Sequence, residues 1–226
     1  IAAVPPFRKI LFSGEKINYG LARALTDRDS LAKEYRPDQM SPLFRVNGTI
    51  NPNTASYNAM VAERFAHWRL EVGGLVNRPL SISHADLLRM PARTQITRHD
   101  CVEGWSAIGK WHGPLLGTIL KAADVRRSAR YVVFTCADLY SGAPYYESID
   151  MIDAFHPQTI LAWAMNDQML GVGHGAPLRL RVERQLGYKN AKYVMRVEAV
   201  ASLDGIGLGK GGYWEDRIGY DWYAGI

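Results

Sequence analysis

Residues 97–106 read TRHDCVEGWS and contain the side chains on which the rest of the interpretation depends. If this segment stays extended as far as Gly104, its period of two places His99, Cys101 and Glu103 on one face. A soft thiol, an imidazole and a carboxylate then lie together. Gly104 permits a sharp turn directly afterwards, which leaves the thiol at a strand end, where sheets commonly present functional groups. These three side chains are therefore candidate site residues, although by itself the pattern is weak.

The local sequence also fits less specific interpretations. Free cysteines are usually buried, so Cys101 could be a small core residue and His99 a hydrogen-bonded core histidine. A zinc site would need about four nitrogen or sulfur ligands, and neither a CxxC nor an HxxxH pair occurs around Cys101 or Cys136. No GxSxG motif of a serine hydrolase is present. A cysteine hydrolase that uses Cys101 stays open, although nothing marks its histidine partner.

Length and composition favour one domain of ordinary globular type. The 226 residues are 47% hydrophobic and 22% charged, and no run approaches the roughly 18 to 20 apolar residues of a membrane-spanning helix. A mixed domain of this length can bury one sizeable core. Cys101 and Cys136 are too few for a disulfide scaffold, although one bridge between them would be possible in an oxidising compartment.

Positive charge is concentrated in residues 179–196. This segment has a single acidic residue, Glu183, so its excess equals the net charge of +5 of the whole chain. The basic residues are Arg179, Arg181, Arg184, Lys189, Lys192 and Arg196. Such a concentration indicates an anionic ligand or a solvated strand face. Nucleic acid is one candidate for this ligand, and a buried phosphate is another, because apolar residues interrupt the basic ones.

Apolar spacing and turn residues predict helices and strands in the first half of the chain and mainly strands in the second. Strands are expected at residues 94–101, 130–136, 144–149, 159–165, 177–183 and 191–201. Helices are expected at residues 55–66, 83–90, 114–123 and 151–155. These elements together predict an α+β fold.

Three local signals make sharper predictions. Asp27 or Asp29 is expected to cap a short helix that runs through Glu34. Residues 68–76 resemble a hairpin with its turn at the two central glycines, 73 and 74. Ser83, followed three residues later by an aspartate, predicts the start of the helix at 83–90.

The segment CVEGWS at 101–106 resembles the metal-cysteine motif of the molybdopterin-binding oxidoreductases of the sulfite-oxidase fold. Within them it is most similar to the branch of the bacterial periplasmic methionine-sulfoxide reductase catalytic subunit. The resemblance continues in order and spans roughly residues 43–200. Its further segments are VGGLVNRPL at 72–80, YVVF at 131–134, HPQT at 156–159, HGAPLR at 174–179 and GYKNAK at 187–192.

This resemblance implies an α+β fold with a largely antiparallel or mixed sheet and flanking helices. It implies molybdenum held by molybdopterin, with Cys101 as the protein ligand to the metal. The residues implied to bind the cofactor are Arg45, Asn47, Cys136, His174, Arg179, Asn190, Ala191 and Lys192. Arg179 and Lys192 would neutralise the terminal phosphate. We expect an N-terminal arm (1–42) packed on a molybdopterin-binding core (43–204), followed by a C-terminal tail (205–226).

The implied reaction is oxygen-atom transfer, with reduction of a sulfoxide or a similar S- or N-oxide as the preferred direction. Electrons would come from a membrane cytochrome, a quinone-linked partner or a soluble carrier, and the protein would be a periplasmic monomer that binds no nucleic acid. Oxidation of sulfite or another small sulfur compound is the alternative. Members that oxidise sulfite hold this dianion with arginines and a tyrosine. Here Val102, Glu103 and Gly104 follow the cysteine, so a carboxylate would lie near the metal, which disfavours a sulfite dianion. A secreted, non-catalytic binding domain on the same fold is an alternative of another class.

Overall fold

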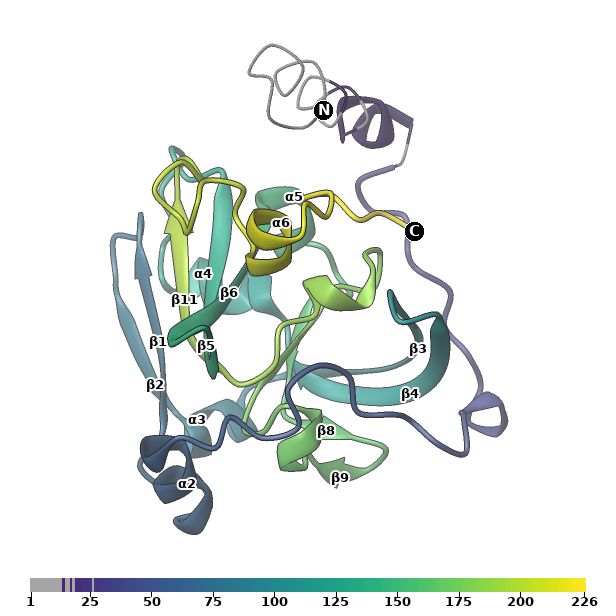
Figure 1. The fold of residues 1–226 in the computed structure, drawn as a ribbon, viewed down its shortest axis with the longest axis vertical. Coiled ribbons are helices and arrows are strands. Elements are labelled where there is room, and N and C mark those ends of the chain that lie inside the picture. Colours follow the sequence, from purple (N-terminus) through teal and green to yellow (C-terminus); the bar gives the residue numbers. More distant parts are fainter. Residues whose placement is uncertain (1–13, 15–16, 18, 26) are drawn as a thin grey trace.

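The strands of the computed structural model, which describes residues 14, 17, 19–25 and 27–226, form three sheets (Figure 1). The five-stranded sheet has the order β2 (Leu80–Ser83), β1 (Arg69–Gly74), β11 (Val194–Val200), β5 (Tyr131–Tyr140) and β6 (Ala143–Asp150). The four-stranded sheet has the order β3 (Ala92–Cys101), β4 (Trp105–Pro114), β8 (Ala164–Met165) and β9 (Gln168–Met169). β7 (Ile160–Ala162) and β10 (Arg179–Arg181) form the third sheet.

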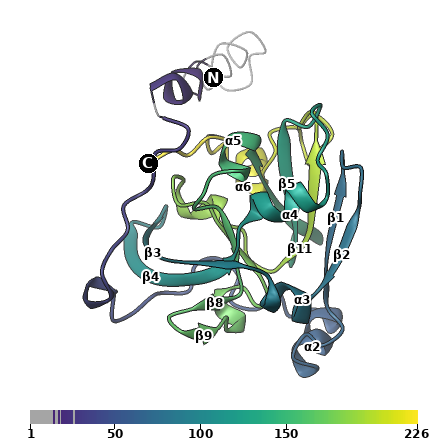
Figure 2. The same ribbon diagram turned by 180° about the vertical axis from the view of Figure 1, so that it is seen from behind.

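Strand pairing is antiparallel throughout the described sheets except between β1 and β11, which run parallel. The helices are short and lie around the sheets (Figure 2). Residues 19–25 are helical. The helices that follow are α2 (Ala55–Ala62), α3 (His84–Arg89), α4 (Leu116–Ala122), α5 (Met151–Ala154) and α6 (Tyr213–Arg217), with 3-10 turns η1 (Pro37–Gln39), η2 (Val172–His174) and η3 (Gly187–Lys189). This arrangement confirms the expected α+β class and mixed sheet.

Two helix starts follow from capping residues. The Ser83 side chain accepts a hydrogen bond from the backbone N–H of Asp86, which confirms the predicted start of α3. Thr54 caps α2 in the same way through Tyr57. The helix expected from residue 114 begins later, because Pro114 is still part of β4 and the N-cap of α4 is the following leucine.

The predicted hairpin turn at Gly73 and Gly74 is wrong. Both glycines belong to β1 and pair with Glu198 and Ala199 of the parallel strand β11, so the chain turns only after them. β1 then pairs with β2. Gly74 has a φ of +77°, and a Cβ there would collide with the backbone of Ala199. Glycine is therefore needed here because β1 and β11 approach closely, and not because the chain makes a two-residue turn.

The helix predicted to run through Glu34 is also wrong. The side chain of Asp27 accepts from the backbone N–H of Asp29, which makes a local turn instead of a helix cap. Glu34 instead forms a β-bridge with Thr97, and the N–H of Tyr35 donates to the backbone of β3. Pairing with an open strand edge therefore overrides local helix signals in this segment.

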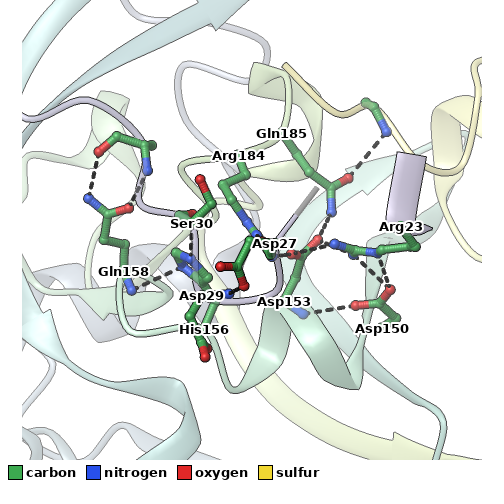
Figure 3. A network of polar contacts seen from close by, with 12 residues as sticks. Arg23, Asp27, Asp29, Ser30, Asp150, Asp153, His156, Gln158, Arg184 and Gln185 are labelled. Atoms are coloured by element: carbon green, nitrogen blue, oxygen red, sulfur yellow. Dashed lines mark hydrogen bonds and ion pairs between the residues drawn. The ribbon is translucent and has the colours of Figure 1, made fainter. Parts of the chain in front are cut away.

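Acidic side chains of α5 and its N-cap hold the N-terminal arm (Figure 3). Arg23 donates to both oxygens of Asp153 and, through Nε, to Asp150. Asp153 also accepts from Arg184 and Gln185. Further along the arm, Figure 3 shows the backbone of residues 30 and 32 bonded to the side chains of His156 and Gln158. The proposed division of the chain at residues 42 and 204 stays a prediction.

The C-terminal tail is tied to the sheet by a buried charge cluster. Lys189 donates to Glu147 of β6 and to Glu215 of α6, and all three side chains are fully buried. Tyr213 and Trp214 of α6 pack against Tyr140 at the end of β5. No helix of the described part of the chain has both the length and the apolar character needed to cross a membrane.

Candidate functional site

The turn between β3 and β4 presents Cys101. This cysteine is the last residue of β3 and pairs with Trp105, the first residue of β4. The N–H of Gly104 donates to the carbonyl oxygen of Cys101 over 3.0 Å, and Gly104 has a φ of +85°, which favours glycine. The thiol is free and only partly buried. It therefore lies at the end of β3, where a ligand can reach it.

Glu103 lies in this turn and not on the extended face that the sequence predicted, because β3 ends at Cys101. Its Oε2 accepts from the indole N–H of Trp105 over 3.0 Å. Burial raises the pKa of the Cys101 thiol, while a hydrogen bond from the Glu103 backbone lowers it. The nearby carboxylate of Glu103 raises this pKa further, and the charge of Arg179 lowers it. The thiol and the carboxylate are therefore neighbours, although by a turn instead of strand alternation.

His99 is 2% exposed, two residues before Cys101 on the same strand. Its Nδ1 bonds to Nη1 of Arg181 over 2.8 Å, and its ring packs against Phe44 and Trp105. Burial lowers the pKa of His99 well below its ordinary value, with the cations of Arg181 and Arg179 as further causes. The imidazole is accordingly neutral.

Arg179 is fully buried at the start of β10. Its guanidinium donates to Oδ1 of Asn47 over 3.2 Å and to the carbonyl of His174 over 3.4 Å, and it lies over the ring of Trp111. Burial and the neighbouring Arg181 lower the pKa of Arg179 to about 9. It remains a cation at neutral pH, in a place where a cation is unfavourable unless an anion joins it.

Lys192 clamps the loop that carries Asn47. Its ammonium donates to the carbonyl oxygens of Asn47, Thr49 and Gly173 over 2.7, 2.5 and 2.8 Å. These contacts use all three of its N–H donors. Burial, and after it the charge of Arg179, lowers the pKa of Lys192 to about 7. Lys192 thus organises the loop directly and adds positive charge to the site at a distance.

The basic segment divides into two groups. Arg181, Arg184, Lys189 and Arg196 each have a carboxylate within ion-pair distance. Among the described residues, Arg179 and Lys192 have none. Of the six basic residues, only these two are therefore left to bind the predicted anionic ligand. The other four form ion pairs with carboxylates of the protein itself.

A small cavity of about 40 Å³ adjoins Lys192. The expected residues Asn190 and Ala191 line it, but the Asn190 side chain already bonds to the backbone of Val182 and Leu186. Asp138 also lines it, and burial raises the pKa of this carboxyl to about 6. The remaining lining residues are Gly48, Thr49, Tyr140, Tyr145, Tyr188 and Trp214.

For two residues on the expected list, Cys136 and Arg45, a contact with the cofactor stays a prediction. Cys136 is 3% exposed within β5, packed in the hydrophobic core opposite Val194. Arg45 is exposed on the loop before Asn47. The sequence did not single out Trp111, Arg181 as a partner of His99, or Asp138, because contacts between distant strands leave no local signal.

The side chains present fit an anionic, hydrogen-bonding cofactor. In the described part of the chain, five buried polar atoms around the site have no hydrogen-bond partner: His99 Nε2, Trp111 Nε1, His174 Nδ1, Arg179 Nε and Asp138 Oδ1. Buried polar groups are normally satisfied, so this concentration points to a ligand. A partly buried thiol that feels the charge of Arg179, a cation without a carboxylate partner among the described residues, suits a soft metal carried by an anionic group.

Comparison with known proteins agrees with this geometry. The family model described as the oxidoreductase molybdopterin binding domain matches residues 58–203. A protein of Azospira oryzae, YedZ1, proposed as a subunit of a protein-methionine-sulfoxide reductase, is 39% identical over 197 residues, covering 84% of this chain and 70% of its own. The protein-methionine-sulfoxide reductase catalytic subunit MsrP of Campylobacter jejuni is 32% identical over 144 residues, 58% of this chain and 48% of its own.

MsrP of Gluconobacter oxydans is 36% identical over 143 residues, 58% of this chain and 46% of its own. The chain thus spans about half the length of the MsrP relatives. Among solved structures, the sulfane dehydrogenase SoxCD of Paracoccus pantotrophus aligns with a TM-score of 0.56 and 24% identity, over 61% of this chain and 39% of the other. That likeness concerns the fold.

Proposed function

The chain belongs to the oxidoreductase molybdopterin binding domain family, and from that premise we propose that it reduces a sulfoxide or a similar S- or N-oxide. The observation that carries the proposal is the partly buried Cys101 thiol at the end of β3, beside a buried Arg179 that has no carboxylate partner in the described chain. The names of the MsrP relatives support a sulfoxide substrate.

We propose that Cys101 is the ligand to molybdenum, and that Asn47, His174, Arg179 and Lys192 hold the molybdopterin. When bound, this cofactor supplies two-electron redox chemistry and an open coordination position for oxygen. Arg179 contributes charge-assisted hydrogen bonds to it. Lys192 holds the loop that carries Asn47. Asn190 and Ala191 line the small cavity next to Lys192, and we propose that they contribute to the cofactor site.

The overall reaction, R₂SO + 2 H⁺ + 2 e⁻ → R₂S + H₂O, needs two protons. Glu103 is exposed next to Cys101, so its carboxylate can take up a proton from solvent and release it at the site. His99, neutral and buried, can donate a hydrogen bond to oxygen without adding charge. We assign Glu103 to proton delivery and His99 to orientation by hydrogen bonding.

A neutral oxide fits these charges better than sulfite. The carboxylate of Glu103 would repel a dianion next to Cys101. Arg181, the other buried arginine near His99, is already neutralised by Glu183. Arg179 would be occupied by the cofactor, and the donors of Lys192 are already used by three carbonyl groups. The site therefore lacks a spare cation for an anionic substrate.

Electrons would come from a membrane haem protein, a quinone-linked partner or a soluble carrier, and the protein would act in the periplasm as a monomer. These assignments are what the resemblance to the methionine-sulfoxide reductase branch implies. The tail at 205–226, with partly exposed Tyr220 and Trp222, is a candidate contact surface for the electron donor.

Metal and pterin analysis followed by substrate assays tests the proposal. The purified protein should contain molybdenum and pterin and should reduce sulfoxides with an artificial electron donor. Cys101→Ser should keep the pterin but change the metal's electronic spectrum and nearly abolish turnover, because a hydroxyl is a poor substitute for a soft thiolate. Wild-type turnover with an unchanged spectrum in Cys101→Ser would exclude the assigned ligand. Oxidation of sulfite without reduction of any S- or N-oxide would reverse the assigned direction.

A further inference from the structure

We propose that Arg181 and Glu183 are positioning residues, which hold His99 beside Cys101 as the neutral tautomer with its proton on Nε2. Only one part of this inference, the role of His99 in turnover, rests on the proposed function. The tautomer itself follows from the hydrogen bonds of the described residues. It can therefore be measured whether or not the reaction class is right.

Arg181 determines which ring nitrogen carries the proton. Its Nη1 lies 2.8 Å from Nδ1 of His99. A guanidinium has only donors, so Nδ1 must be the acceptor and cannot carry a proton. A neutral ring then has its proton on Nε2. With the opposite tautomer, or with a doubly protonated ring, two N–H groups would face each other at this distance.

Glu183 determines where the Arg181 guanidinium lies. Oε1 accepts from Nε over 3.0 Å and Oε2 from Nη2 over 2.6 Å, so the pair is bidentate and planar. The two side chains are 1% and 0% exposed. Because Nε and Nη2 are engaged by the carboxylate, the remaining Nη1 is directed at His99.

Two further contacts fix this pair within the fold. Gln95, four residues before His99 on β3, donates through Nε2 to Oε1 of Glu183 over 2.8 Å and to the carbonyl oxygen of Gln158 over 2.9 Å. The Arg181 guanidinium also lies 4.3 Å from the ring centre of Trp111, a cation–π distance. A closed set of buried contacts thus runs from β3 to β10 and back to β3.

The result is an N–H donor that stays available to a ligand. Nε2 of His99 is buried without a hydrogen-bond partner among the residues described. It lies against Gly187, where a Cβ would come within 2.6 Å of it. Gly187 opens the segment that leads to Asn190 and Lys192. The donor therefore lies against Gly187, and no acceptor among the described residues takes its proton. We infer that it bonds an oxygen or nitrogen acceptor of the bound cofactor or substrate.

The test combines ¹⁵N NMR of the His99 ring in the resting holoenzyme with steady-state kinetics. The His99 signals are assigned by their loss in His99→Gln. The wild type should show a protonated Nε2 and an unprotonated Nδ1. Glu183→Gln, of equal size, and Arg181→Lys, of equal charge, should both give a mixture of tautomers. They should lower kcat by about tenfold or more, as misplacement of a reacting group does, with a much smaller change in KM and an unchanged molybdenum content.

Glu147→Gln is the matched control, because it also removes one carboxylate from a fully buried ion pair, with Lys189, that does not contact His99. It should keep the single His99 tautomer. A proton on Nδ1 in the wild type, or a single unchanged tautomer in both Glu183→Gln and Arg181→Lys, would overturn the proposal. Absence of molybdenum or of oxide reduction in the wild type would count against the proposed function instead, since the tautomer measurement does not require turnover.

Discussion

Nη2 of Arg179 donates to Oδ1 of Asn47 over 3.2 Å, a contact between β10 and a loop 132 residues earlier in the chain. Lys192 holds the backbone of the same loop. The two basic residues therefore act on one loop in different ways. Arg179 donates to the side chain of Asn47, and its Nε has no partner in the described chain. Lys192, in contrast, donates only to backbone carbonyl groups. This difference gives them separable effects on cofactor binding and stability.

Replacing Arg179 with glutamine should lower cofactor occupancy without destabilising the cofactor-free protein. Loss of a charge-assisted hydrogen bond costs about 1.5 to 3 kcal/mol, hence roughly a tenfold to hundredfold loss in affinity. The cofactor-free protein loses the long hydrogen bonds to Asn47 and His174, but it also loses a buried cation without a carboxylate partner, which is unfavourable by itself. Pterin and metal content, with urea unfolding of the cofactor-free form, would check both effects. Arg196→Gln, at a mostly exposed position of the same basic segment, should change neither.

Replacing Lys192 with methionine should destabilise the cofactor-free protein, unlike Arg179→Gln. Three carbonyl groups lose their donor, at a cost of about 1 to 3 kcal/mol. The loop around Asn47 should then exchange its amide hydrogens faster, which hydrogen–deuterium exchange would detect. Unchanged exchange in that loop would show that the clamp does not hold it in place.

Replacing Asp138 with asparagine should stabilise the cofactor-free protein near neutral pH but not in acid. Burial raises the pKa of this carboxyl from 3.8 to about 6, against the opposing effects of Thr49 and Lys192. Above about pH 6 both folded and unfolded chains carry the ionised group, so the cost of burying it is fully present. Between about pH 6 and pH 4 the folded protein binds the proton first, so this cost disappears as pH falls.

The expected stabilisation of Asp138→Asn is at most about 3 kcal/mol near pH 7.5, from about 1.4 kcal/mol per pKa unit. It should vanish near pH 4. Urea unfolding of the two cofactor-free proteins at both pH values measures the difference. An equal difference at the two pH values would mean that ionisation of Asp138 is not its cause.

Adjacent glycines of β1 should respond in opposite ways to alanine. Gly74→Ala should destabilise the protein by about 1 to 3 kcal/mol, because the residue has a φ of +77° and its new Cβ would meet the backbone of Ala199. Gly73 has no atom within 4 Å of a Cβ among the described residues, so Gly73→Ala should be neutral or stabilising by less than about 1 kcal/mol. Thermal unfolding of the two variants tests this. A similar loss in both would contradict the assigned strand pairing.

Local sequence was sufficient for much of the fold. The α+β class, the capped start of α3 and the strands of the second half follow from spacing and capping, which act within a few residues. The predictions for Gly73 and Glu34 failed for a common reason. Both segments pair with a strand distant in sequence, β11 and β3 respectively, and such pairing overrides turn and helix preferences.

The sequence by itself determined which side chains are available: a cysteine before a glycine turn, a histidine two residues earlier, and an excess of positive charge in residues 179–196. Only the tertiary structure decided which of these charges are free to meet a ligand. Arg181 and Lys189 are neutralised by buried carboxylates, whereas Arg179 has no such partner among the described residues. Charge neutralisation depends on distances of a few ångströms between residues far apart in the chain, and these distances exist only after folding.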